Sequence, residues 1–148
     1  MMRSVRQIVL ETGIAGGLLF TIHASIPNVD SWPMIWPALA GAAAFWLATR
    51  QPRPHRLRTG LAAALTAGVI VGAIAFVGTS IVVYAVLHSG VVRSVRPAGV
   101  PPGLITSASI LALAALGVVD MVVAVIAGAL MLPVRYFQIR HSHPQAIH

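Results

Sequence analysis

The 148-residue sequence contains no cysteine and no lysine, and only 9 % of its residues are charged. The absence of cysteine excludes disulfide bonds, thiolate metal sites and cysteine nucleophiles. An ordinary soluble domain carries roughly 25 % charged residues, so this chain has too few to cover a surface that faces water. Its composition therefore excludes a soluble enzyme, a nucleic-acid-binding domain and a disordered chain.

Acidic residues are also scarce, with three against ten basic residues, and the net charge is +7. Every basic residue is an arginine, and the arginines form short clusters between long apolar runs. A protein that binds a nucleic-acid groove needs a basic stripe on one element, with aromatic residues interleaved. We therefore expect no nucleic-acid partner and interpret the clusters as loops of a membrane protein.

Long apolar segments make up most of the chain, which is 57 % hydrophobic with a mean hydropathy of +0.87. Four of them predict helices, at residues 7–26, 32–49, 59–90 and 104–134. A helix that crosses the bilayer needs about 20 mostly apolar residues, and the period-two alternation of a barrel strand is missing. The sequence predicts an all-α integral membrane protein, a single domain of four transmembrane helices in an antiparallel bundle, with a short basic, His-containing cytoplasmic tail at residues 135–148.

The arginines also predict how the chain is oriented. Two precede the first apolar segment, four lie between the second and third, and two follow the fourth, whereas the first loop has none and the third has two. Arginine-rich loops remain on the cytoplasmic side. We expect both termini in the cytoplasm, and a multi-pass protein of the bacterial inner (cell) membrane.

Small residues recur at helical spacing, and such rows let transmembrane helices approach closely. They serve either packing within one bundle, which we favour, or a homo-oligomer interface. Segments 12–18 and 59–65 also resemble each other, and we expect them to lie at similar depth and to pair. The residues of the predicted packing rows are Gly13, Gly17, Gly60, Ala64, Gly68 and Gly72.

Asp120 is the most informative residue, because it lies near the middle of the fourth apolar segment. A carboxyl at this position costs about 2.5–3.5 kcal/mol on insertion scales, so it is expected to face the protein interior. One interpretation is a proton or cation site. The other, slightly favoured, is a carboxyl that fixes helix packing through a hydrogen bond to a hydroxyl of the third segment, at Thr66, Thr79 or Ser80.

Glu11 lies about one turn inside the first apolar segment. It is a second candidate for a proton or cation path, as the cytoplasmic gate of a route that leads to Asp120. The interpretation we favour is an ion pair with Arg58, because charges near helix ends reach the headgroup layer.

His23 and His88 both fall near the outer ends of their predicted helices. Two helical histidines at one depth can hold haem or a metal ion between helices. Polar residues at a helix end are the commoner use of such positions, and the sequence predicts no cofactor. Haem or metal binding through this pair stays a minor alternative.

No pattern typical of catalysis appears: the sequence has no HExxH, GxSxG or phosphate-binding loop, and no paired carboxylates at one depth. We therefore expect a protein that is not an enzyme. The leading hypothesis is an accessory or structural subunit of a membrane assembly, with the lipid bilayer and other membrane subunits as partners. The alternative is a homo-oligomeric, proton- or cation-coupled small transporter or channel that uses Asp120.

Overall fold

A computed structural model of the chain describes residues 4–26, 32–51, 55–88 and 102–141. It contains four helices, α1 (Val5–Ala24), α2 (Ile35–Thr49), α3 (Arg56–His88) and α4 (Pro102–His141). The prediction of an all-helical chain with four helices is confirmed. Three of them, α1, α3 and α4, are long and apolar enough to cross a membrane.

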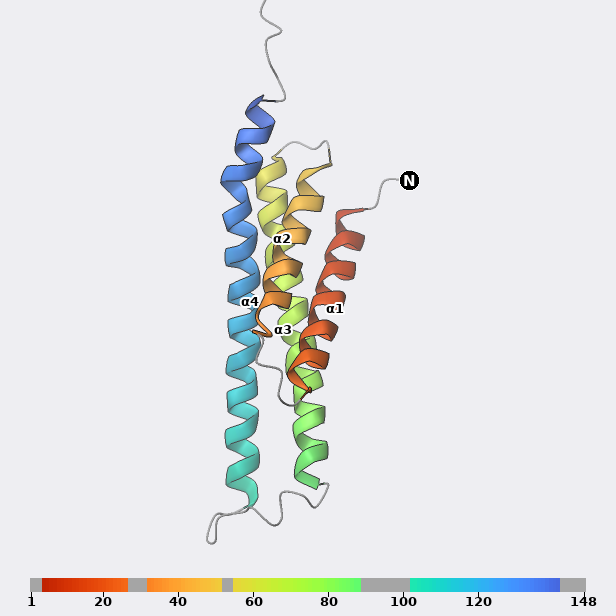
Figure 1. Cartoon of the computed structure of the whole chain (residues 1–148), viewed down its shortest axis with the longest axis vertical. Coiled ribbons are helices and arrows are strands. Elements are labelled where there is room, and N and C mark those ends of the chain that lie inside the picture. Colours follow the sequence, from red (N-terminus) through yellow and green to blue (C-terminus); the bar gives the residue numbers. More distant parts are fainter. Residues whose placement is uncertain (1–3, 27–31, 52–54, 89–101, 142–148) are drawn as a thin grey trace, which may run out of the picture.

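The helices form an elongated bundle in which neighbours in sequence run in opposite directions, so that α1 begins and α4 ends at the same end (Figure 1). α2 and α3 contact each other and both remaining helices, whereas α1 and α4 make no contact within the described part of the chain. The central pair α2–α3 therefore holds the two outer helices together.

Helix α2 is shorter than expected from the sequence, with 15 residues that span about 22 Å. It begins at Ile35 rather than at residue 32, and Pro37 lies in its first turn. Proline is tolerated there because the first N–H groups of a helix have no partner inside the helix. α2 is apolar but shorter than the roughly 20 residues that a helix needs to cross a bilayer.

Helix α4 continues through Pro133 to His141, whereas the sequence predicted its end at residue 134. Residues 135–141 of the predicted tail are therefore helical, and residues 142–148 lie outside the described residues. A side-chain contact accompanies the extension. Arg135 Nη2 donates a hydrogen bond of 3.1 Å to the carbonyl of Thr49, which ties the last turns of α4 to the end of α2.

Trp46 strengthens the same junction between α2 and α4. The guanidinium groups of Arg50 and Arg135 lie 5.5 and 5.3 Å from the centroid of its ring, within the range of a cation–π interaction. Both charges also lie near the C-terminal end of α2, where the helix dipole favours a cation. This cluster fixes one end of the bundle.

The seam between α2, α3 and α4 is built from glycine and alanine. A Cβ added to Gly41 of α2 would overlap the main chain of Ala124 in α4, and one added to Gly72 of α3 would lie 2.5 Å from the carbonyl oxygen of Gly117. The backbones thus touch with no side chain between them. Such close approach maximises van der Waals contact where lipid supplies no hydrophobic drive between helices.

Helices α1 and α3 pack side by side in the same direction, with glycines of α1 against isoleucines of α3. A Cβ on Gly13 would lie 2.8 Å from Ile70 Cβ, and one on Gly17 would lie 2.7 Å from Ile74 Cβ. Gly60 is ten residues before Ile70, so segments 12–18 and 59–65 lie about 15 Å apart along the bundle. The expected pairing of these segments is wrong. The glycines of α1 pack against the branched side chains of Ile70 and Ile74, not against the small residues of segment 59–65.

The six residues of the predicted packing rows all contact other helices of the same chain. Those of α1 face α3, Gly60 faces the end of α2, and the rest of the row on α3 faces α4. Their positions favour packing within the bundle over an interface between copies.

Substitution of Gly41 by alanine tests the seam. Because the added Cβ meets main-chain atoms of Ala124 that cannot move alone, the free energy of unfolding should fall by about 2 kcal/mol. Gly117→Ala is the comparison, since its added Cβ would come no closer than 3.0 Å, to the Gly72 carbonyl oxygen, and it should cost clearly less. Thermal unfolding in detergent measures both, and equal losses would contradict the described seam.

Candidate functional site

Asp120 lies in the seam, on the face of α4 that packs against α2 and α3. Gly117, one turn before it, packs against Gly72 of α3, and Ala124, one turn after it, packs against Gly41 of α2. The Asp120 side chain is 0 % exposed. The only ionisable residue in the middle of α4 is thus enclosed by the other helices of its own chain.

The carboxylate of Asp120 has no hydrogen-bond partner among the described residues, at either oxygen. The three hydroxyls that the sequence offered as partners all donate to carbonyls of their own helix, as hydroxyls in lipid commonly do. The bonds are those of Thr66 to the Ala62 carbonyl, Thr79 to the Ala75 carbonyl and Ser80 to the Phe76 carbonyl. The structure therefore does not show the hydrogen bond through which Asp120 was expected to fix helix packing.

The first turn of α2 lies at the level of Asp120, because α2 and α4 run in the same direction and Gly41 packs against Ala124. Pro37, which has no N–H, is buried in this turn. The N–H groups of the two preceding residues donate at 3.2 Å to carbonyls three residues earlier in the chain. The start of α2 consequently offers no hydrogen bond to the carboxylate.

An enclosed carboxyl without a partner is costly, since burial of an uncompensated polar group opposes folding. An ionisable residue within an apolar helix of this kind is a candidate functional site. The chemistry available to Asp120 is the uptake of a proton or the binding of a small cation, each of which requires the seam to open.

Glu11 lies on the exposed side of α1, where Gln7 Nε2 donates to its Oε1 at 2.9 Å. Gly13 of α1 packs against Ile70 of α3, so Glu11 lies level with residue 68 of α3. Arg58 is ten residues from that position, or about 15 Å along the helix. The structure therefore sets the predicted ion-pair partners at different levels. Glu11 is also remote from Asp120, since α1 and α4 are not in contact within the described residues.

His23 lies at the junction between α1 and α2. Trp36 Nε1 donates a hydrogen bond of 3.0 Å to His23 Nδ1, and the two rings meet edge to face with 6.3 Å between their centroids. This bond ties the end of α1 to the start of α2. Sequence reasoning missed it, although two polar aromatic residues on either side of a short connection were a usable signal.

The expected partner of His23 lies elsewhere. Gly78 of α3 packs against Thr21 of α1, so His88 lies eight residues beyond the level of His23, about 12 Å further along α3. The structure describes the backbone of His88 as the last residue of α3 but not its side chain. Among the residues that the structure describes, no group of three or more His, Cys, Asp or Glu side chains could hold a metal ion.

A groove between the start of α3 and the end of α4 is a second feature that the sequence did not predict. We call it the basic groove; it has a volume of about 790 Å³. Four basic side chains contribute to its lining, those of His55, Arg56, Arg58 and Arg140. Its residues are far apart in sequence, which is why no local motif revealed it.

No family model, no curated protein and no solved structure matches the chain. Asp120 and the basic groove are therefore the features on which a functional proposal can be built.

Asp120→Asn tests whether the carboxylate stabilises the bundle. Because neither oxygen has a partner, the free energy of unfolding should stay within about 1 kcal/mol of the unaltered protein. Ala124→Asn is the control, since it places an amide in the same seam against backbone, and it should cost about 2 kcal/mol or more. Thermal unfolding in detergent compares them, and a large loss for Asp120→Asn would show that the carboxylate has a structural partner.

Proposed function

We propose that the chain is a non-enzymatic accessory or structural subunit of a larger assembly in the bacterial inner membrane. The observation that carries this proposal is the enclosed seam. The backbones of α2, α3 and α4 touch at Gly41 and Gly72, and Asp120 is fully enclosed between them. Closely packed helices thus fill the interior of a single chain, which favours a function that the chain carries out together with other subunits.

The outer surface supports the same proposal. α3 and α4 extend beyond α1 and α2 at the end where α3 ends and α4 begins (Figure 1). Both long helices also carry exposed apolar side chains, among them Ile81 of α3 at 63 % and Leu111 of α4 at 77 %. In the C-terminal half of α4, Leu130 is 67 % exposed. These surfaces suit lipid or the apolar helices of other membrane proteins.

The proposed orientation places both termini and the connection between α2 and α3 in the cytoplasm. The supporting observation is the arginine bias of the sequence. The cluster of Arg50 and Arg135 around Trp46 would then lie at the cytoplasmic interface, where tryptophan is enriched.

Native mass spectrometry of the protein, extracted in mild detergent from the membranes of its own host, tests the proposal. We expect the chain to be released together with other membrane proteins in a fixed stoichiometry. A tagged chain expressed in a foreign host is the control for contaminants. Recovery as a monomer without protein partners would contradict the accessory role, and a homo-oligomer of this chain alone would favour the second candidate below.

The second candidate is an oligomeric, proton- or cation-coupled transporter or channel. The specific observation in its favour is that the Asp120 carboxylate is buried without a hydrogen-bond partner among the described residues. Burial of such a group lowers the free energy of unfolding, and no hydrogen bond compensates for the loss. Within one chain the seam would have to open between α2 and α4 to let a proton or cation reach it.

Proton flux into vesicles tests this candidate. Vesicles that contain the protein and an entrapped pH-sensitive dye are given a pH gradient, and a transport role predicts that the unaltered protein dissipates it at least about tenfold faster than Asp120→Asn. Asp30→Asn is the control, because it removes a carboxyl from the connection between α1 and α2, outside the apolar segments. Equal rates for the unaltered protein and Asp120→Asn would exclude proton movement through this residue.

A further inference from the structure

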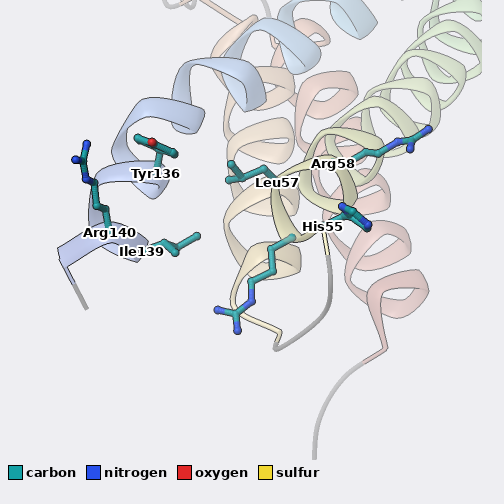
Figure 2. A pocket seen from close by; sticks show the side chains of 7 residues that line it. His55, Leu57, Arg58, Tyr136, Ile139 and Arg140 are labelled. Atoms are coloured by element: carbon teal, nitrogen blue, oxygen red, sulfur yellow. The ribbon is translucent and has the colours of Figure 1, made fainter. Parts of the chain in front are cut away.

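The basic groove joins two kinds of surface. Tyr136, Ile139 and Arg140 contribute from α4, and Leu57 lies across from them at the start of α3 (Figure 2). Leu57 and Ile139 point toward the space between α3 and α4, whereas Arg58 and Arg140 extend away from it on opposite sides (Figure 2). The groove therefore has an apolar and aromatic floor between positively charged edges.

The charge on these edges is not balanced by acidic residues of the groove. Its lining has three arginines and one histidine and includes no Asp or Glu. The whole chain has three acidic residues, of which Glu11 belongs to α1 and Asp120 is enclosed in the seam, while Asp30 lies outside the described residues. A counter-charge for the groove is thus expected from a bound anion.

The position of the groove along the bundle indicates where that anion lies. Tyr136 directly follows Arg135, whose guanidinium lies over the ring of Trp46. Tryptophan, tyrosine and arginine near helix ends mark the boundary between the hydrocarbon core and the headgroups. The groove consequently lies at headgroup depth at the end of the bundle where α1 begins and α4 ends (Figure 1).

We propose that the basic groove binds the phosphate group of an anionic phospholipid from the adjacent leaflet. The arginines at the edges turn onto the phosphate oxygens when the lipid binds, since a guanidinium offers them paired donors, and an acyl chain lies along the floor of Leu57, Tyr136 and Ile139. Basic pockets between transmembrane helices bind anionic headgroups in this way. The apolar floor distinguishes a lipid from a soluble phosphate ester, which would use the charged edges alone.

Lipid retention measured by native mass spectrometry tests this site. The intact protein is prepared in nanodiscs of phosphatidylglycerol and phosphatidylcholine and released in detergent, and we expect bound phosphatidylglycerol in preference to phosphatidylcholine. Arg56→Gln/Arg140→Gln removes one arginine from each wall of the groove and should reduce retained phosphatidylglycerol by about tenfold. The control is Arg3→Gln/Arg6→Gln, which removes the same charge near the start of the chain and should change retention little.

Two further measurements keep the proposal falsifiable. Arg56→Lys/Arg140→Lys keeps the charge but not the paired donors, and we expect it to fold like the unaltered protein and to retain more phosphatidylglycerol than the glutamine variant. Equal losses in the groove variant and the Arg3/Arg6 control, or equal retention of the two lipids, would overturn the site. Displacement of the lipid by millimolar glycerol phosphate would overturn the lipid assignment in favour of a soluble phosphate ester.

Discussion

Contact between helix backbones is the constraint on which the rest of this structure depends. Gly41 of α2 packs against the main chain of Ala124, and Gly72 of α3 packs against Gly117, both in α4. In lipid no hydrophobic effect draws helices together, so dispersion contacts at this distance hold the bundle. The same contacts place α2 and α3 at the centre of the bundle and leave α1 and α4 apart from each other.

This packing also determines the environment of Asp120. Because Gly117 and Ala124 on either side of it are in backbone contact with α3 and α2, the carboxyl cannot reach lipid or the membrane surface. Its helix neighbours offer no donor, since the nearby hydroxyls bond within their own helix. Burial of this carboxyl thus lowers the stability of the bundle that encloses it. The two proposed functions differ here: a transporter or channel requires the seam to open, and an accessory subunit does not.

The sequence predicted the number of helices and their approximate bounds because each apolar run has its own length and flanking arginines. It did not predict the register between helices, which depends on shape: Gly13 packs against Ile70 and not against the similar segment around Gly60. That register also separates His23 from His88. Where α4 continues past Pro133, Arg135 contacts the end of α2, a contact between distant segments that no local pattern encodes.

Chemical modification of Asp120 is the most direct test of the enclosed seam. A hydrophobic carbodiimide enters the bilayer and reacts with protonated carboxyl groups, and mass spectrometry of peptides locates the adduct. In native membranes the enclosed seam predicts no adduct on Asp120, whereas the same residue reacts once the protein is unfolded in SDS. An adduct on Asp120 in native membranes would contradict the account, because it would show that the seam between α2, α3 and α4 opens to the lipid.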